Sequence, residues 1–425
     1  MLCYTLSFVD RQILSLLVAP IKRDLSISDT RMGLLQGFAF ALFYTFLGLP
    51  IGRLADRFSR RNLIASGIFL WSVMTALCSA ARSYGFLFLA RVGVGVGEAA
   101  LSPSAFSLIA DYFPPERLAS AVSVYSMGIF MGSGLALIVG GTIVDSVAHF
   151  NTAILPVLGE VTAWRLAFLA IGAPGVLFVL LIYTVREPLR RRLLRAADGQ
   201  VRNLTLPEVS AQVLLRWQSV AGISVGMVFQ SMCTYAFTAW APAFLQRSYG
   251  WTAGQSGRAL GIVVLASCCS GMYVGGLLSD RWQRRGVSDA PLRVAVWAAI
   301  GTGLFFPPSL MTSSSKISLI LFVPALFCMA LPIGCIFASL QLILPNQIRG
   351  QVSAVLLFVL NLGGLSLGPL LPGVFNDYLF HSEKMLGTSV AITIGLASLL
   401  QLIIFPATYR FYVRDYKVMQ NLKAS

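Results

Sequence analysis

The sequence predicts an all-α membrane protein with twelve transmembrane helices, arranged as two pseudo-symmetric bundles of six. Of the 425 residues, 56% are hydrophobic and only 12% are charged, a balance typical of polytopic membrane proteins. Apolar runs of about 20 residues, the length that crosses a bilayer as a helix, recur along the chain. One loop motif occurs twice, 224 residues apart, which indicates two related halves.

Short polar connections separate the twelve apolar runs and define the expected helices in order. Their expected limits are 1–21, 32–52, 62–81, 85–110, 118–144, 164–185, 217–245, 255–279, 292–312, 317–344, 350–375 and 387–411. The first six form the expected N-terminal bundle, residues 1–188. A basic cytoplasmic linker at 189–215 precedes the C-terminal bundle, residues 216–425.

The net charge of +15 follows from how the 32 Lys and Arg residues are distributed. Most of them fall in the connections and the C-terminal tail on the side of the membrane that holds the N-terminus. The positive-inside rule therefore predicts cytoplasmic N- and C-termini. A basic surface facing anionic membrane lipids explains the charge without a nucleic-acid partner. We expect an integral multi-pass protein of the bacterial inner membrane.

The sequence gives little evidence for an enzyme or a metal site. The seven Cys residues lie in apolar runs without CxxC spacing, which favours buried small side chains over a disulfide framework or a zinc site. Both histidines, His149 and His381, lie in expected outer connections. We expect no cofactor, no metal and no catalytic cluster. The N-terminal run has no basic lead-in, so we expect it to be retained as a helix.

Two charged residues, Asp10 and Arg11, interrupt the first apolar run. Asp10 lies roughly 13 Å along that helix, near the bilayer centre. Because adjacent helical residues point about 100° apart, each needs a partner on another helix. The fourth run offers Arg91 and Glu98, which are two turns apart and share one helix face. These four residues form a predicted charge cluster, neutral when both acids are ionised and positive when either is protonated.

Small residues mark the fifth and eleventh runs, where they predict close helix packing. They are Gly128, Gly132, Gly134, Gly140 and Gly141 in the fifth, and Gly363, Gly364, Gly368, Pro369, Pro372 and Gly373 in the eleventh.

The repeated motif reads GRLADRFSRR from Gly52 and GLLSDRWQRR from Gly276. It lies between the second and third runs and again between the eighth and ninth, and it resembles the signature loop of the major facilitator superfamily. The resemblance implies the major facilitator fold and a gating role for six residues: Gly52, Asp56, Arg57, Gly276, Asp280 and Arg281. The glycines would permit close helix approach, and the acids would pair with a base or cap a helix N-terminus. Alternatively, the arginines only anchor the topology.

Further residues are similar to the Spinster branch of this superfamily, which includes carriers of lysophospholipids and sphingosine 1-phosphate. They are Asp10-Arg11, LARVGVGVGEA at 89–99, IADYFP at 109–114, Gly132-Ser-Gly134 and Arg186-Glu187-Pro188. The resemblance covers mostly the N-terminal half. It implies that the first and fourth helices line a central cavity, so that Asp10, Glu98 and the two arginines should all face it. It also implies that the halves rock about this cavity and that the protein acts as a monomer.

We therefore expect a secondary transporter of an amphiphilic, anionic, lipid-like solute. In this hypothesis Asp10 and Glu98 couple transport to protons, and protonation releases Arg11 or Arg91 to bind the anionic group. The C-terminal half supplies uncharged candidates for an apolar tail with a few hydrogen bonds: Gln230, Thr234, Tyr235, Gln341 and Asn361. The partners are the small solute, protons and membrane lipids.

Other interpretations stay open at this point. The same cluster would suit a carrier of small organic anions or xenobiotics. It could also be a static buried ion network that only fixes helix packing. Outside transport, the alternatives are a lipid sensor and an intramembrane lipid enzyme, although neither a sensor domain nor a nucleophile with its base is evident in the sequence.

Overall fold

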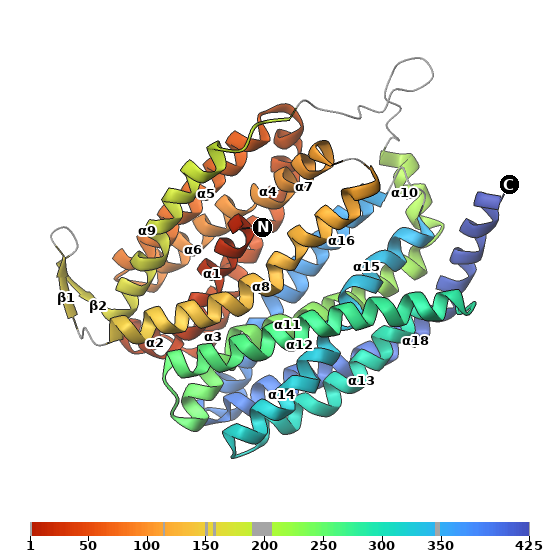
Figure 1. Ribbon diagram of the computed structural model, residues 1–425. Helices are drawn as coiled ribbons and strands as arrows, with labels where there is room; N and C mark the ends of the chain where they lie inside the picture. Colours follow the sequence, from red (N-terminus) through yellow and green to blue (C-terminus); the bar gives the residue numbers. More distant parts are fainter. Residues whose placement is uncertain are drawn as a thin grey trace.

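The computed structural model describes residues 2–113, 115–148, 152–155, 159–188, 206–344 and 349–424. Almost all of them are helical, and the helices form two bundles, warm-coloured for the N-terminal half and green to blue for the C-terminal half (Figure 1). The predicted all-α membrane fold is confirmed.

The N-terminal half contains α1 Leu2–Leu16, α2 Val18–Leu25, α3 Asp29–Gln36, α4 Phe38–Arg57, α5 Arg60–Leu77, η1 Cys78–Ala80, α6 Tyr84–Glu98, α7 Leu101–Tyr112, α8 Pro115–Ala148, β1 Thr152–Leu155, β2 Gly159–Thr162 and α9 Ala163–Tyr183. The C-terminal half contains α10 Leu206–Leu214, α11 Trp217–Tyr249, α12 Ala253–Arg284, α13 Ala290–Met311, α14 Ser315–Ala330, α15 Pro332–Ile343, α16 Arg349–Leu360, η2 Asn361–Leu365, α17 Ser366–Val374, η3 Phe375–Phe380, η4 Glu383–Met385 and α18 Leu386–Ala424.

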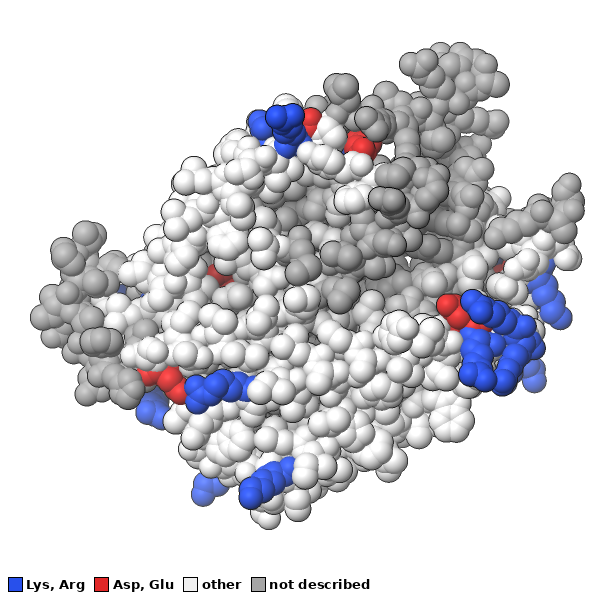
Figure 2. All heavy atoms as spheres, viewed as in Figure 1, with Lys and Arg blue, Asp and Glu red and all other residues white. Residues whose placement is uncertain are grey.

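Among the described residues, 10 helices are long and apolar enough to cross a membrane, and the bent pair of α1 and α2 would make an eleventh. The remaining expected run, 32–52, falls on α3 and α4, where several side chains lie outside the described residues. On the face shown in Figure 2, charged side chains gather toward the ends of the helices and leave an uncharged band between them. Such a band is what a bilayer requires.

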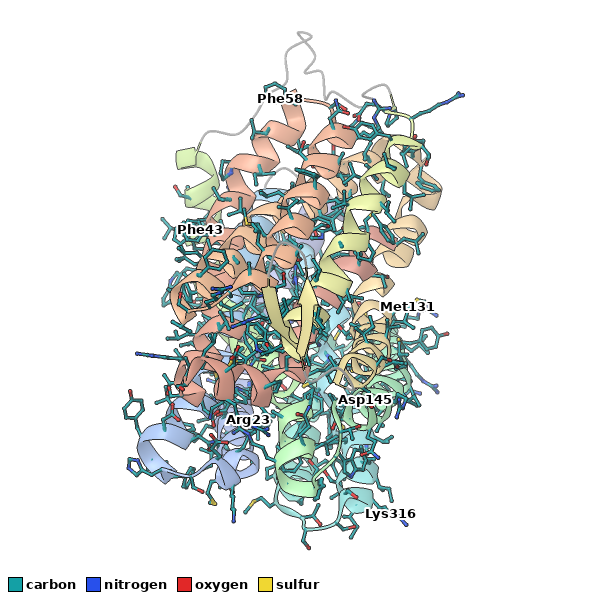
Figure 3. The ribbon with its side chains drawn as sticks, turned by 90° about the vertical axis from the view of Figure 1, so that its left-hand side faces the viewer. Arg23, Phe43, Phe58, Met131, Asp145 and Lys316 are labelled. Atoms are coloured by element: carbon teal, nitrogen blue, oxygen red, sulfur yellow. The ribbon has the colours of Figure 1, made fainter. Side chains whose placement is uncertain are left out.

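The two ends of the molecule are distinguishable. Phe58, beside the first loop motif, and Lys316, at the start of α14, lie at opposite ends (Figure 3). We call these the motif end and the hairpin end, because the antiparallel pair β1 and β2 directly precedes α9 at the second of them. The expected linker includes α10, whereas residues 189–205 lie outside the described residues.

Several runs that composition predicts as continuous helices are interrupted. The first bends by 60° at Leu17, the fourth breaks at Ala99 and Ala100, and the tenth breaks at Leu331 before Pro332. The eleventh changes to a π-helix at Asn361–Leu365. Hydrophobic composition does not reveal such breaks, since the residues on both sides are equally apolar. Discontinuous helices of this kind are typical of the binding sites of transporters.

Two seams join the halves. In one, α8 packs against α12, and in the other, α3 packs against α17. Glycines make both seams possible: a Cβ on Gly257 would lie 2.2 Å from the Leu137 carbonyl oxygen, and one on Gly33 would lie 2.5 Å from that of Pro369. The close packing expected around Gly134 is confirmed, since its Cβ would meet Leu265 at 2.2 Å.

Candidate functional site

A cavity of about 350 Å³ lies between the two halves. Of the seven residues that the sequence nominates for solute binding, five line it, namely Arg11, Arg91, Gln230, Tyr235 and Asn361. Thr234 is the sixth that lines it, and the side chain of the seventh, Gln341, lies outside the described residues. The side chains that line the cavity come from both bundles, as a site for an alternating-access carrier requires.

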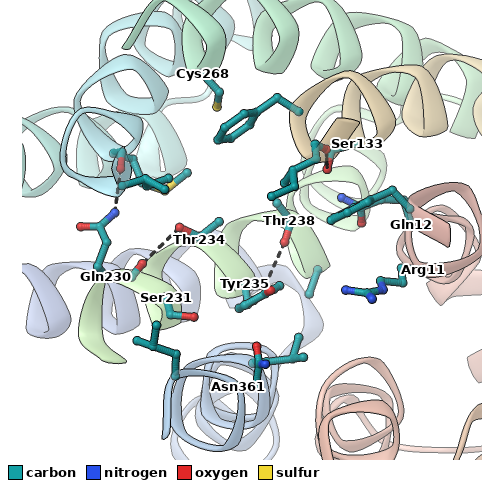
Figure 4. Close-up of a pocket in the computed structure, with 18 of the residues that line it drawn as sticks. Arg11, Gln12, Ser133, Gln230, Ser231, Thr234, Tyr235, Thr238, Cys268 and Asn361 are labelled. Carbon is teal, nitrogen blue, oxygen red and sulfur yellow. Dashed lines mark hydrogen bonds between the residues drawn. The ribbon is translucent and has the colours of Figure 1, made fainter. Parts of the chain in front are cut away.

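The cavity has a charged wall and an uncharged, largely apolar wall. Arg11, Gln12, Gln36 and Tyr44 line it from the N-terminal half. Most of the side chains from the C-terminal half are apolar, and they include Met272, Leu326, Met329, Ile333, Phe337 and Leu360. In the close-up, Arg11 and Gln12 lie across the cavity from Gln230 and Ser231 (Figure 4). An amphiphilic molecule would match this division.

Arg11 is held in place by Glu98 and by aromatic rings. Its Nε donates to Glu98 Oε2 at 2.7 Å, and its Nη2 forms an ion pair with the same oxygen. The guanidinium carbon also lies 4.2 Å from the centre of the Phe40 ring, a cation–π contact. Glu98 is only 1% exposed. Arg11 therefore presents a cavity-facing guanidinium whose charge is balanced from behind by a buried carboxylate.

Asp10 occupies a different position from the one expected. Neither Asp10 nor Glu98 is among the described residues that border the cavity, so the prediction that both acids face it is wrong. Because Arg11 takes the cavity face of α1, the neighbouring Asp10 points into the N-terminal bundle, within electrostatic range of Glu98 and Arg91. Its side chain is 1% exposed, and neither carboxyl oxygen has a hydrogen-bond partner among the described residues.

Arg91 joins the cluster through the backbone. Its Nη1 donates to the carbonyl oxygen of Asp10 at 3.1 Å, and its Nε has no hydrogen-bond partner among the described residues. The four charged residues are thus brought together, with Arg11 and Arg91 at the cavity and the two acids behind them.

Only part of the two loop motifs lies among the described residues. The side chains of Asp56 and Arg57 and the surroundings of Gly52 lie outside the described residues. In the second motif, Asp280 and Arg281 are exposed at the end of α12. The close approach expected at Gly276 is corrected, since a Cβ there would meet nothing within 4 Å. Its neighbour Gly275 makes the approach instead, with a Cβ position 1.9 Å from the Leu331 carbonyl oxygen.

A second network, at the motif end, ties the N-terminal bundle together. Arg60 donates from Nε to Glu187 at 2.9 Å and forms an ion pair with Asp111. Glu187 also accepts from the backbone N–H of Arg61 at 2.8 Å. Burial alone would raise the pKa of Glu187, but the N–H of Arg61 and the guanidinium of Arg60 hold that pKa below its usual value. Glu187 and Asp111 belong to the Spinster-like motifs, and these motifs were the only sign of this network that the sequence offered.

A third network lies at the hairpin end and connects the halves. Asp29 at the start of α3 is fully buried and accepts two hydrogen bonds of 2.8 Å from Arg247 of α11. Lys22 donates to it at 2.6 Å, and Asn376 donates to it at 2.8 Å. Burial alone would raise the pKa of Asp29, but Arg247, Lys22 and Asn376 lower it to about 2. Sequence reasoning missed this site, because Asp29 stands in a short polar connection between apolar runs.

Two helical bundles around a central polar and apolar cavity, joined at one end by an ion network, define a membrane carrier that moves small molecules. The comparisons with known proteins agree. The chain belongs to the major facilitator superfamily, whose family model matches residues 1–369.

Individual members of this superfamily are similar to the chain. An "MFS-type efflux pump" of Mycolicibacterium smegmatis is 30% identical over 423 residues, covering 97% of this chain and 91% of the relative. Human "Protein spinster homolog 1" is 32% identical over 252 residues, covering 58% of this chain and 45% of the relative. The chain thus aligns with less than half of the human protein's length.

The solved structures include a bacterial homologue of the human lysosomal transporter Spinster in an inward-facing and unoccupied conformation. It matches with a TM-score of 0.79 and 25% identity, covering 99% of this chain and 96% of that one. The predicted resemblance to the Spinster branch is confirmed. The protein is an integral multi-pass secondary transporter of small molecules and not an enzyme.

Proposed function

We propose that this protein is a proton-coupled transporter of an amphiphilic, anionic, lipid-like solute of the lysophospholipid or sphingoid phosphate type. It acts as a monomer in the bacterial inner membrane, with both termini and the motif end in the cytoplasm. The observation that carries the proposal is the pairing of cavity-lining Arg11 with buried Glu98, opposite a largely apolar wall.

The anionic group of the solute would bind at Arg11. A guanidinium can donate two parallel hydrogen bonds to a phosphate or carboxylate. In this state the Nε and Nη2 of Arg11 both contact one oxygen of Glu98, Oε2. A solute anion and Glu98 therefore compete for the same donors. Protonation of Glu98 removes its charge and leaves Arg11 free to bind the solute.

The second acid sets the net charge of the cluster. An ionised carboxylate that is buried without a hydrogen-bond partner is costly, so Asp10 is expected to carry a proton in this arrangement. With Asp10 neutral and Glu98 ionised, the two arginines leave the cluster with one net positive charge. That charge suits a monoanionic headgroup, and a change in the protonation of either acid changes the affinity.

The apolar wall suits the tail of such a solute. Met272, Met329, Ile333 and Phe337 offer no charge to the cavity, and methionine side chains adapt to apolar groups of different shape. A volume of about 350 Å³ lies at the small end of the range for ligand pockets. The cavity would hold the headgroup and the first part of a tail.

The hairpin end would be the outer barrier in this state. The Asp29 network joins α2 and α3 to α11, so the halves separate there only if its ion pairs break. The matched bacterial Spinster homologue is inward-facing, which supports this assignment.

A second candidate is export of small organic anions or xenobiotics. It is favoured by the efflux pump that aligns with 97% of this chain. The adaptable methionines of the apolar wall would serve it equally well.

A substrate panel in proteoliposomes separates the candidates. Lysophospholipids and sphingoid phosphates are expected to bind and to be transported, and water-soluble organic anions of equal charge are not. Transport of the water-soluble anions alone would overturn the lipid assignment in favour of the second candidate.

Arg11→Lys tests the headgroup site within the same assay. Lysine keeps the charge but cannot donate a fork of two hydrogen bonds. Because one charge-assisted hydrogen bond contributes about 1.5–3 kcal/mol, the variant is expected to bind the solute at least about tenfold more weakly. Arg165→Lys, whose side chain pairs with Asp24 at the hairpin end, is the matched control and should bind normally. Equal affinities of the Arg11 variant and the wild type would place the headgroup elsewhere.

A further inference from the structure

In each half of the molecule, an aspartate carboxylate accepts hydrogen bonds from the N-terminus of a helix in the other half. Asp145, near the end of α8, accepts from the backbone N–H of Gly254 at 2.8 Å and from the Thr252 hydroxyl at 3.1 Å, at the start of α12. Asp377, in η3, accepts from the backbone N–H of Thr30 at 2.6 Å and from that of Asp29 at 3.2 Å, at the start of α3. Figure 3 shows Asp145 where α8 meets the second half.

The two contacts are equivalent under the repeat. The N-cap residues Ser28 and Thr252, and the amide donors Thr30 and Gly254, are separated by the same 224 residues as the two loop motifs. In both N-caps the hydroxyl accepts from the amide three residues later, on Arg31 and on Gln255 respectively. One arrangement therefore occurs twice, once in each seam.

The physical basis is the set of unpaired N–H groups at a helix N-terminus, together with its partial positive charge. Asp145 and Asp377 satisfy such groups from across the seam, although neither belongs to the helix that it caps. The seam around Asp145 is shaped for this contact, because a Cβ on Gly254 would lie 1.9 Å from Asp145 Oδ2. A side chain at that position would displace the carboxylate.

We propose that Asp145 and Asp377 form a reciprocal latch that holds the hairpin end closed. When the halves separate there, both helices lose their caps together, because the two contacts lie in seams related by the same pseudo-symmetry. The latch adjoins the Asp29 ion network, because Asp377 accepts from the backbone N–H of Asp29 itself. Its own hydrogen bonds come from backbone N–H groups and a threonine hydroxyl, and from no basic side chain. It rests on the rocking of the two halves and not on the identity of the solute.

Hydrogen–deuterium exchange of the purified full-length protein, without added solute, tests the latch. In Asp145→Ala, amides around Gly254 are expected to exchange about fivefold faster or more, as loss of a cap implies. Because the latch is reciprocal, the amides of Asp29 and Thr30 should also exchange faster. In Asp377→Ala, the amides of Asp29 and Thr30 should exchange faster, and so should the amides around Gly254.

Two further variants keep the test decisive. Gly254→Ala displaces Asp145 without removing its charge, and it should reproduce the effect of Asp145→Ala at both sites. Asp24→Ala is the matched control, because Asp24 accepts from Trp164 and Arg165 within its own half. It should leave both N-termini unchanged. If each substitution accelerates only the amides that it caps, or none, the reciprocal latch does not exist, whatever the solute proves to be.

Discussion

At the scale of single residues, Asp10 and Arg11 show how neighbours on one helix can have different roles. Arg11 reaches the cavity and pairs with Glu98, whereas Asp10 is turned into the N-terminal bundle with no hydrogen-bond partner among the described residues. The sequence predicted that the two would not pair with each other. It could not predict which of them would face the cavity, because that depends on the rotation of α1 against its neighbours.

Asp10→Asn tests whether this carboxyl carries a proton in the folded protein. Asparagine has the same shape as a protonated aspartic acid and no charge, so the melting temperature should change little, by an amount equivalent to less than about 1 kcal/mol. The measurement is thermal unfolding of the purified variant at neutral pH. A static network that needs an ionised Asp10 would instead lose several kcal/mol, as buried ion pairs do when one partner is removed.

At the scale of helices, small residues determine where the two halves touch. The glycines of the fifth and eleventh runs were predicted to permit close packing, and Gly134 does so against Leu265 of α12. The helix breaks at Leu17, Ala99 and Leu331 were not predicted. Apolar periodicity reports which residues are buried, but a break depends on tertiary contacts that composition does not contain.

Gly257→Val is expected to open the seam between α8 and α12. The new side chain would meet the Leu137 carbonyl oxygen, since even a Cβ would lie 2.2 Å from it. The closed hairpin end would be disfavoured, and reagents added from that side should label a cysteine introduced at the cavity residue Thr238 faster than in the wild-type background.

Gly395→Ala in α18 is the matched control for this prediction. A Cβ at Gly395 meets nothing within 4 Å, so labelling should stay at the wild-type rate. Unchanged labelling of the Gly257 variant would show that this seam does not control access to the cavity.

At the scale of the whole molecule, the motif end and the hairpin end are stabilised by different ion networks. The network of Arg60, Asp111 and Glu187 at the motif end lies within one half, whereas the Asp29 network at the hairpin end joins the two. The all-α membrane fold and the cavity residues Arg11, Arg91, Gln230, Tyr235 and Asn361 were accessible from the sequence. The Asp29 network was not, because its members come from connections far apart in the chain, whose spatial proximity only the fold creates.

The Asp29 network makes stability depend on pH in a defined direction. The folded pKa of about 2 lies below the ordinary value of about 3.9, so this group stabilises the folded protein against unfolding above about pH 4. The contribution, of the order of 2 kcal/mol, is lost as the pH falls from about 4 through 2. Asp29→Asn should therefore lower the melting temperature at neutral pH, and the difference from wild type should shrink below pH 4. A constant difference across that range would show that the charge of Asp29 is not the cause.

Proton movement during transport tests the central claim most directly. Proteoliposomes with a pH-sensitive dye inside are given a lysophospholipid, and the change in internal pH is compared between the wild type and Asp10→Asn with Glu98→Gln. The account predicts a solute-dependent pH change in the wild type and none in the double variant. Solute transport by the wild type with no pH change, or an equal pH change in the double variant, would contradict it.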